Sequence, residues 1–307
     1  MHRTPFKKST TFNKITEKNV FLKLENLQKT GSFKIRGAMN KVSQLSEAEC
    51  AKGLIAASAG NHAQGVAFSG KARNVPVTIF MPLGTPVSKV NATKGYGATV
   101  KLIGQNFDEA YIAAREEQLR TGATFIHPFD DMAVIEGQAT VAMEMLQQRP
   151  ELDTIVVPAG GGGLLAGTLL AVKSIRPDIR VIGVQSRNAS AIAFAYKGNG
   201  LLPFLGKSIA EGINVKIPGN LTMNIIQALV DDVITVSEQE IASAILFTLE
   251  REKTLIEGAA AAAVAAVLNN RIPESSQNVG IIVSGGNIDV SKLDECQQLC
   301  TNMPLAK

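Results

Sequence analysis

The stretch TGSFKIRGAMNK, from Thr30 to Lys41, places the cationic side chain of Lys34 among small and apolar residues. A lysine in such a setting either extends its amine to solvent or keeps it desolvated, as a nucleophile or a base. Arg36 and Lys41 in the same stretch do not distinguish these two interpretations. The residue types and spacing of three other segments do.

Four consecutive glycines, from Gly160 to Gly163, join a predicted strand to a predicted helix in the segment DTIVVPAGGGGLLAGTLLAVKS. Glycine leaves the backbone N–H groups uncovered, and the helix N-terminus adds a partial positive charge. Together these features make a cradle for an anion, most simply a phosphate. The alternative is a flexible loop without a ligand, at a considerable cost in conformational entropy.

The glycine loop fits a small phosphorylated cofactor better than a dinucleotide. Gly161, Gly163 and Ala166 match the loose pattern G-x-G-x-x-G/A. The acidic residue that binds the ribose in such sites is missing, because the next predicted strand ends in Gln185. No Gly-Lys-Ser/Thr follows the glycines, so the Walker motif is absent as well. A nicotinamide oxidoreductase is therefore disfavoured.

Two further segments carry polar side chains directly after predicted strands. In AASAGNHAQGVAFSG, the residues Ser58, Asn61 and His62 offer N–H groups and side-chain donors that could seat a carboxylate. The alternative is an ordinary helix N-cap by Ser58 or Asn61. In VGIIVSGGNID, Ser284 follows a buried strand and could share a hydrogen bond with a neutral ring nitrogen. Taken alone, Ser284 is more often a cap or turn residue.

The elements that must position these residues are short apolar strands alternating with helical patterns, which predicts an α/β fold with a mostly parallel sheet. Ligands of such sheets lie at the carboxyl ends of the strands. Ser237 and Glu240 have the spacing of a capping box at a helix start. The predicted strands are Val20–Leu24, Gly53–Ala57, Val77–Met81, Thr99–Ile103, Thr124–His127, Thr154–Val157, Val181–Gln185, Val233–Val236 and Val279–Val283, and two of the predicted helices are Phe107–Arg120 and Ser237–Glu252.

The composition excludes several other classes of protein. The chain has 307 residues, 45% of them hydrophobic, which is enough for a sizeable core. A net charge of +4, no long Lys/Arg run and no Trp argue against nucleic-acid binding. The run Gly258–Leu268 is too short to span a membrane and predicts a buried helix. The three cysteines have no metal-site or disulfide spacing, which favours a reducing cytoplasm.

The segments LENLQKTGSFKIRGAMN, SAGNHAQG, PAGGGGLLAG and VSGGNID, in this order, closely resemble the fold-type II pyridoxal-phosphate enzymes. Within that group the resemblance is to the threonine/serine dehydratase and serine racemase family, closest to the short catabolic threonine dehydratases. It implies pyridoxal 5'-phosphate as cofactor and a two-lobed α/β fold like that of tryptophan synthase β, with mostly parallel twisted sheets and flanking helices. It also implies a large cofactor-binding domain, residues 1–52 plus 133–307, and a small domain, residues 53–132, that carries the substrate loop.

By this resemblance, Lys34 is the catalytic residue that forms the Schiff base with the cofactor aldehyde and then takes the α-proton of the substrate. Phe33 would pack on the pyridine ring, Asn61 would bind the ring hydroxyl, and Ser284 would face the ring nitrogen. The phosphate would be held by Gly160, Gly161, Gly162, Gly163 and Leu164. The loop that binds the substrate carboxylate would comprise Ser58, Ala59, Gly60, Asn61 and His62.

The activity implied is the dehydration and deamination of L-threonine to 2-oxobutanoate and ammonia, and of L-serine to pyruvate, in amino-acid degradation or isoleucine biosynthesis. Homodimers or homotetramers, a cytoplasmic location and a nucleotide effector such as AMP are further implications. Serine racemases and β-replacement enzymes of the same fold are the alternatives within this group. A nonenzymatic phospholigand-binding protein is the alternative from another class, disfavoured because a mere binder needs no amine at the position of Lys34.

Several positions depart from the pattern of the family. Racemases carry a second serine where this chain has Ala59, so dehydration is favoured over racemisation. The positions that match their divalent-metal site are Gln185 and Ala191, neither of which offers a carboxylate, so we expect no metal there. The Arg3-Thr4-Pro5 segment lies unusually near the start. The chain also ends soon after VSGGNID, so we expect no regulatory domain and no feedback by isoleucine.

Overall fold

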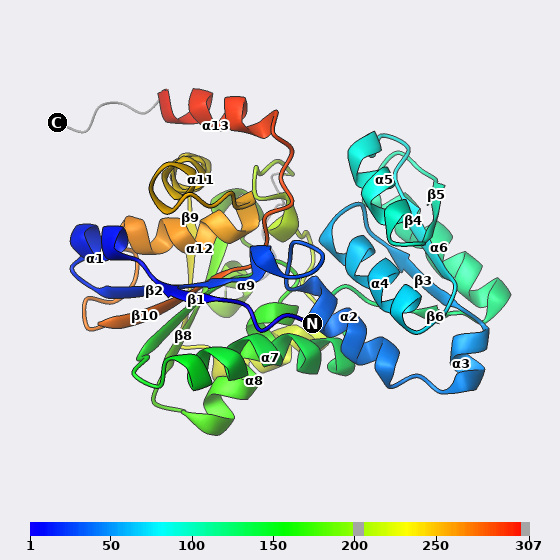
Figure 1. The fold of residues 1–307 in the computed structure, drawn as a ribbon, viewed down its shortest axis with the longest axis horizontal. Helices are drawn as coiled ribbons and strands as arrows, with labels where there is room; N and C mark the ends of the chain where they lie inside the picture. The colour runs from blue at the N-terminus through cyan, green and yellow to red at the C-terminus, as the bar shows by residue number, and fades with distance from the viewer. Residues whose placement is uncertain (199–205, 302–307) are drawn as a thin grey trace.

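The computed structural model describes residues 1–198 and 206–301, and these form two separate β-sheets with helices around them. Six strands make the larger sheet, in the order β1-β2-β10-β7-β8-β9, and four make the smaller one, in the order β5-β4-β3-β6. All described strand pairs are parallel except β1 with β2. Figure 1 shows the two sheets side by side, with α2 between them. The predicted mostly parallel α/β fold is confirmed.

All nine predicted strands are present, with ends that shift by a few residues. Most of them are apolar runs buried on both faces, whereas β5 at the edge of the smaller sheet is not buried. The largest difference is β6, which ends at Phe125 instead of His127. The strand β1 was not predicted. The strands are β1 (Phe6–Lys8), β2 (Asn19–Leu24), β3 (Leu54–Ala57), β4 (Val77–Met81), β5 (Thr99–Leu102), β6 (Thr124–Phe125), β7 (Thr154–Pro158), β8 (Arg180–Ser186), β9 (Asp232–Val236) and β10 (Asn278–Val283).

The helices begin at the expected signals where these exist. The capping box is present at the start of α11, since Glu240 N donates to Ser237 Oγ and Ser237 N to Glu240 Oε2. The helices are α1 (Thr10–Thr16), α2 (Lys34–Ser43), α3 (Glu47–Ala51), α4 (Asn61–Ala72), α5 (Val87–Gly95), α6 (Phe107–Thr121), α7 (Met132–Gln148), α8 (Gly163–Ile175), α9 (Ala191–Tyr196), α10 (Asn220–Leu229), α11 (Glu238–Glu252), α12 (Gly258–Leu268) and α13 (Lys292–Thr301), with short 3₁₀ turns η1 (Glu25–Leu27), η2 (Arg187–Ala189) and η3 (Glu211–Ile213).

The larger sheet is covered on both faces, as its apolar strands require. Alternate residues of β7 face opposite sides: Val156 packs in the cluster that contains α12, whereas Ile155 and Val157 pack in the cluster that contains α7 and α8. Figure 1 shows α11 and α12 on one side of this sheet and α7 and α8 on the other. The predicted buried helix is α12, with every residue from Gly258 to Val267 buried.

The helix that begins with Lys34 is held close to α7 by glycine contacts. A Cβ at Gly137 would lie 2.5 Å from the carbonyl oxygen of Arg36 and 2.6 Å from Cα of Gly37. The amide N–H of Gly37 donates to Oε1 of the buried Gln138, at 3.2 Å. Only glycine permits this approach of the two backbones, so the position of α2 against α7 is fixed at the backbone level.

A buried network of charged side chains fixes α2 a second time. The Arg36 guanidinium, which is 1% exposed, contacts the carboxylates of Glu25 and Glu144, both at 2.7 Å. Lys23, which is fully buried, donates to Glu144 at 2.6 Å and to the carbonyl oxygen of Thr4 at 2.9 Å. The two cations and two anions neutralise one another, because a buried charge is tolerated only beside a partner of opposite charge.

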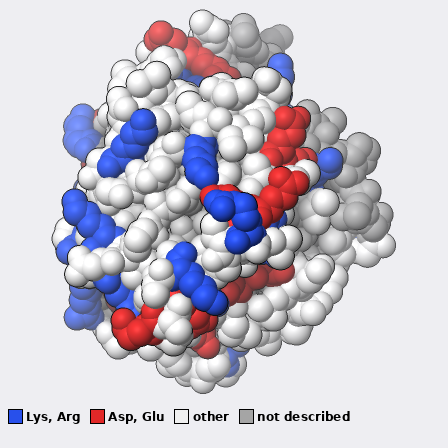
Figure 2. Space-filling model, turned by 90° about the vertical axis from the view of Figure 1, so that its right-hand side faces the viewer, with Lys and Arg blue, Asp and Glu red and all other residues white. Residues whose placement is uncertain are grey.

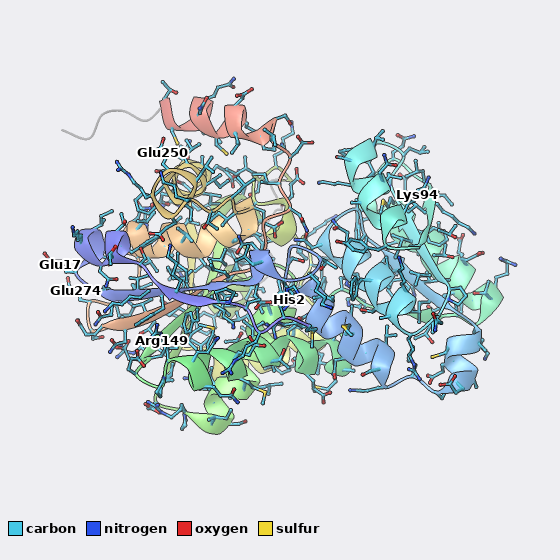
Figure 3. All side chains as sticks on the ribbon, in the orientation of Figure 1. His2, Glu17, Lys94, Arg149, Glu250 and Glu274 are labelled. Atoms are coloured by element: carbon cyan, nitrogen blue, oxygen red, sulfur yellow. The ribbon has the colours of Figure 1, made fainter. Side chains whose placement is uncertain are left out.

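Many charged side chains elsewhere lie on the outside of the molecule. Lys94, Glu250 and Glu274 are exposed and point away from the sheets in Figure 3. On the face that Figure 2 shows, blue and red side chains are interspersed without one large patch of a single sign. No helix in the described parts of the chain is long and apolar enough to cross a membrane.

Candidate active site

The motif residues gather where parallel strands of the two sheets end. The glycine loop follows β7 and Ser284 follows β10, and these strands are parallel neighbours, so their carboxyl ends meet. Ser58 and Asn61 follow β3, an inner strand of the smaller sheet that pairs with β4 and β6. Lys34 begins α2, which lies between the two sheets in Figure 1. This is the arrangement that ligand sites of parallel sheets use.

Lys34 is held in place by the backbone on its N-terminal side. Ser32 forms an isolated antiparallel bridge with Gly285, and the amide N–H of Phe33 donates to the carbonyl oxygen of Ser284, at 3.0 Å. These bonds join the start of α2 to the end of β10. Lys34 and Ser284, which are 250 residues apart in the chain by their numbers, are therefore neighbours in the site.

The Lys34 amine is in an environment that favours its neutral form. Its Nζ donates to the carbonyl oxygen of Pro128 at 2.8 Å and lies 5.4 Å from the centroid of the Phe33 ring. Burial lowers the pKa of this amine from 10.5 to about 8, and the carboxylate of Glu257 acts against that shift. A neutral amine can attack a carbonyl carbon or accept a proton, and the desolvated interpretation of Lys34 is the one that fits.

The glycine loop leaves a row of backbone donors without acceptors. Among the described residues, none accepts a hydrogen bond from the amide N–H of Gly160, Gly161, Gly162, Gly163 or Leu164. Gly162 has φ = +97°, which favours glycine, and α8 begins directly after it. Thr222 fixes the loop from behind, because its Oγ1 donates to the carbonyl oxygen of Gly161 at 2.7 Å. Such a row of N–H groups at a helix start fits a phosphate.

Side chains could not replace these glycines without moving the loop. A Cβ at Gly161 would lie 2.3 Å from the ring of Phe129, and a Cβ at Gly160 would lie 2.9 Å from Cα of Ile213. The rigid Phe129 ring and the backbone at Ile213 cannot give way at low cost. The close contacts therefore explain why the loop uses glycines despite their cost in conformational entropy.

We predict that Gly161→Ala weakens the binding of pyridoxal phosphate by about tenfold or more, because the new methyl group displaces either the loop or Phe129. Equilibrium titration of the cofactor, followed by absorbance, measures this change. Gly95→Ala is the matched control, because a Cβ at Gly95 in α5 meets no atom within 4 Å. Unchanged cofactor affinity in Gly161→Ala would contradict a role of this loop in holding the phosphate.

The loop after β3 offers a second set of donors. The amide N–H of Gly60 donates to Ser58 Oγ at 3.2 Å, and α4 begins at Asn61 with Gly60 as its N-cap. The amides of Asn61 and His62 have no acceptor among the described residues. Ser58, Ala59, Gly60 and Asn61 are all half-buried. The start of α4 can therefore receive a carboxylate.

The ring of His62 does not face this loop. Its Nε2 lies 2.8 Å from the carbonyl oxygen of Ile126 and therefore carries the proton. Burial, with the nearby Lys34 amine as a smaller cause, lowers the pKa of His62 to about 3, so the ring is neutral. If His62 contributes to a carboxylate site, it does so through its backbone N–H.

The Asn61 amide is engaged at both ends. Its Nδ2 donates to Oε1 and Oε2 of Glu257, at 2.8 and 2.9 Å, and its Oδ1 accepts from Nδ2 of Asn287, at 2.7 Å. Burial raises the pKa of Glu257 to about 7, while the Asn61 hydrogen bond and the Lys34 charge act in the opposite direction. Glu257 thus contacts the start of α4 directly, and the charge of the Lys34 amine acts on it.

Four residues of this site were not singled out from the sequence: Glu257, Asn287, Phe129 and Thr222. Glu257 directly precedes the apolar run that forms α12, and an acid at that point could have been recognised as buried. Asn287 lies within the motif VSGGNID, after a strand end. Phe129 follows the predicted end of β6 in the sequence HPFDD. No local signal marks Thr222.

The residues present fit pyridoxal phosphate. Ser284 as a residue is only 2% exposed, and its hydroxyl has no hydrogen-bond partner among the described residues, so it is free to donate to a ring nitrogen. Lys34 supplies an amine with a lowered pKa, and the Phe33 ring lies beside it. The glycine loop supplies the phosphate cradle described above. An aldehyde, a ring nitrogen and a phosphate would each find a suitable partner.

The position that matches a metal site in racemases is occupied by neutral contacts. Gln185 is fully buried, and its Nε2 donates to the carbonyl oxygen of Ala159 while its Oε1 accepts from the amide of Ala193. Within residues 1–198 and 206–301, no group of three His, Cys, Asp or Glu side chains could hold a metal ion. That no metal binds at Gln185 and Ala191 stays a prediction.

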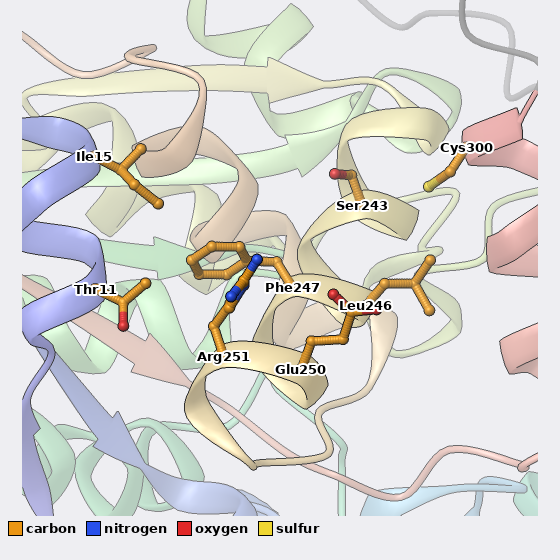
Figure 4. A pocket seen from close by; sticks show the side chains of 8 residues that line it. All are labelled: Thr11, Ile15, Ser243, Leu246, Phe247, Glu250, Arg251 and Cys300. Atoms are coloured by element: carbon orange, nitrogen blue, oxygen red, sulfur yellow. The ribbon is translucent and has the colours of Figure 1, made fainter.

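An open hollow of about 460 Å³ lies elsewhere on the molecule, between α1 and α11. Figure 4 shows its lining, with Phe247, Glu250 and Arg251 from α11 facing Thr11 and Ile15 from α1. None of the motif residues contributes to it. This hollow is therefore separate from the candidate active site.

Comparisons with known proteins agree with the site geometry. A model of the pyridoxal-phosphate-dependent enzyme family matches residues 1–285. An L-threonine ammonia-lyase of Thermotoga maritima is 48% identical over 295 residues, which are 96% of this chain and 73% of that protein. Among solved structures, the processed threonine deaminase isoform 2 of Solanum lycopersicum superposes with a TM-score of 0.92 at 35% identity, over 97% of this chain and 88% of that one. Maize serine racemase gives 0.91 at 37% identity, over 97% and 92%.

Proposed function

This chain belongs to the pyridoxal-phosphate-dependent enzyme family, and we propose that it converts L-threonine to 2-oxobutanoate and ammonia as an L-threonine ammonia-lyase. The observation that carries this proposal is the position of Lys34. Its amine, with a pKa near 8, lies next to Ser284 and the Phe33 ring, in a site that the glycine loop completes. Serine, which lacks only the γ-methyl group, is the expected second substrate, because one methyl group gives limited discrimination.

Each part of the site has one proposed task. Lys34 Nζ would hold the cofactor covalently, and as a free amine it would take the α-proton of the substrate. Its lowered pKa suits both tasks at neutral pH. The amides from Gly160 to Leu164 hold the phosphate, and Ser284 Oγ binds the ring nitrogen without protonating it. The amides at the start of α4, with Ser58, hold the substrate carboxylate and orient the α-proton toward Lys34.

Bound pyridoxal phosphate supplies the electron sink that stabilises the charge left by removal of the α-proton. Loss of the β-hydroxyl then competes with return of a proton to the α-carbon. Racemisation requires an acid on the face opposite the catalytic lysine, and Ala59 has no hydroxyl to serve as one. Although maize serine racemase has the same fold, Ala59 therefore favours elimination over the racemase alternative.

The proposal is tested by an absorbance spectrum of the purified protein with pyridoxal phosphate, before and after addition of L-threonine. We expect a visible band of bound cofactor that changes on addition of substrate, together with release of 2-oxobutanoate. L-serine should give pyruvate, and D-serine should not accumulate. A protein that takes up no cofactor would refute the cofactor assignment, and a protein that binds the cofactor but releases no 2-oxo acid would refute the lyase activity.

The finer features of the resemblance are part of this proposal. We propose that residues 53–132 form a small domain that closes on residues 1–52 plus 133–307 and excludes water from the substrate. The separate sheets of β3–β6 and of the other strands support this division. On the resemblance alone, we also propose a homodimer or homotetramer, a nucleotide effector such as AMP and a cytoplasmic location.

A further inference from the structure

A chain of three hydrogen-bonded side chains crosses the candidate active site. Asn287 Nδ2 donates both to the carbonyl oxygen of Thr30, at 2.8 Å, and to Oδ1 of Asn61, at 2.7 Å. Asn61 Nδ2 in turn donates to both carboxylate oxygens of Glu257. Asn61 follows a strand of the smaller sheet, whereas Glu257 and Asn287 belong to elements around the larger one. The chain therefore joins the two halves of the molecule.

The two ends of this chain determine its direction. A backbone carbonyl accepts hydrogen bonds but donates none, and a carboxyl group offers an accepting oxygen whether it is ionised or protonated. With Thr30 at one end and Glu257 at the other, each asparagine amide has only one orientation that avoids two donors or two acceptors facing each other. The nitrogen of Asn61 must therefore lie on the side of Glu257, and its oxygen on the side of Asn287.

Glu257 has no evident structural task that would explain its burial. It is the N-cap residue of α12, but its side chain makes no capping hydrogen bond to that helix. Its carboxylate is buried, and its only hydrogen-bond donor among the described side chains is Asn61. The other charges that act on it are Lys34, Lys89 and Glu211. Burial of a carboxylate is costly, so a task for Glu257 at this place has to be sought in the site.

We propose that Glu257 is a positioning residue, which turns the Asn61 amide so that an N–H, and not the carbonyl oxygen, faces the ring oxygen of the bound cofactor. The inference depends on the proposed function and on the family resemblance, by which Asn61 binds that oxygen. The ring oxygen is an acceptor when it is ionised, so it requires a donor. Asn61 Nδ2 carries two hydrogens, one for Glu257 and one for the cofactor. Removal of the acceptor at residue 257 would leave the Asn61 amide held by Asn287 alone, on one side, and so less firmly oriented.

The test compares Glu257→Met, which removes the acceptor, with Glu257→Gln, which keeps one acceptor oxygen without the charge. For Glu257→Met we expect about tenfold weaker retention of pyridoxal phosphate and a smaller share of bound cofactor in its visible absorption band, as for loss of one hydrogen bond to a charged group. Glu257→Gln should stay within about threefold of the wild type. An equal loss in both variants would overturn the positioning role and indicate a need for the charge.

A double-mutant cycle with Asn61→Ala shows whether Glu257 acts through Asn61. If it does, Glu257→Met should change cofactor retention and the band ratio by less than about twofold when Asn61 is already alanine. The same tenfold loss in that background would overturn the proposal. Glu252→Met is the matched control, because Glu252 is also buried but contacts Ser9 and Lys7, far from the motif residues. It should leave the band ratio unchanged.

Measurements on the wild-type protein distinguish a failure of the Glu257 role from a failure of the proposed function. A wild type that takes up no pyridoxal phosphate would refute the proposed function. If the wild type binds the cofactor and turns over L-threonine, and Glu257→Met has the same cofactor retention and band ratio, the role of Glu257 is refuted while the proposed function stands. A variant that loses only thermal stability, with its spectrum unchanged, would also refute that role, since a structural contact alone would not alter the band ratio.

Discussion

Lys34→Ala is expected to lower kcat/KM for L-threonine by about a thousandfold or more, because in the proposed function one amine serves as both cofactor anchor and base. Burial lowers the pKa of this amine to about 8, and the hydrogen bond from Phe33 N to Ser284 O places it in the site. The visible absorption band of the bound cofactor should disappear with the side chain. Release of 2-oxobutanoate by the variant, measured with saturating cofactor, gives the rate, and the spectrum gives the mode of binding.

Lys41→Ala is the matched control, because Lys41 lies on the same helix and pairs with Asp131 near the surface, at 2.7 Å. It should keep its spectrum and most of its activity, as expected for loss of a partly exposed ion pair. A Lys34→Ala protein that is folded and still yellow would contradict the covalent role. A colourless Lys34→Ala protein with wild-type turnover would contradict the catalytic role.

The same amine predicts a pH dependence in the wild type. Only the neutral form of Lys34 can attack the cofactor aldehyde, so uptake by the apoprotein should become faster as the pH rises and level off above about 8. An ordinary lysine would keep gaining rate up to about pH 10. Stopped-flow absorbance distinguishes the two profiles.

The sequence predicted the strands well because nearly all of them are apolar runs buried on both faces, and such runs need no tertiary information to be recognised. The strand β1 escaped because it has three residues, lies at the edge of the sheet and buries only Phe6. Its pairing with β2 depends on contacts made in the fold, which no local pattern records. The predicted end of β6 at His127 failed for a similar reason, since the ring of His127 accepts a bond from the amide of Asp130 and closes a turn.

The candidate site was predictable to the extent that its residues follow strands. Asn61, Ser284 and the glycine loop each come shortly after an apolar strand, and parallel strands bring such positions to one edge. Lys34 does not follow a strand directly, and its sequence motif singled it out instead. Glu257 and Phe129 act through packing between elements that are distant in sequence. Phe129 contacts the glycine loop and Glu257 contacts Asn61 only because the two halves of the molecule meet. Sequence patterns predict which face of a helix or strand is buried and where it ends, but not which side chains from distant segments contact it.

Arg36→Met is expected to lower the free energy of unfolding by about 3–5 kcal/mol, because it leaves the carboxylate of Glu25 buried without its bidentate partner. The guanidinium Nε and Nη2 lie 2.7 and 2.8 Å from the two oxygens of Glu25, which is fully buried. Glu144 loses a partner as well, although Lys23 still contacts it. Urea unfolding of the apoprotein, followed by circular dichroism, measures the loss.

Arg176→Met is the matched control, because Arg176 also forms a bidentate pair, with Asp178, but in an exposed position. An exposed pair contributes at most about 1 kcal/mol, so this variant should unfold almost like the wild type. Equal losses in the two variants would contradict the assignment of the Arg36 effect to burial. Because Arg36 lies two residues after Lys34 on α2, its loss should also weaken retention of pyridoxal phosphate, even in the fraction of protein that remains folded. A destabilised variant that binds the cofactor as tightly as the wild type would show that the glycine contacts of α2 with α7 suffice to hold the Lys34 amine in place.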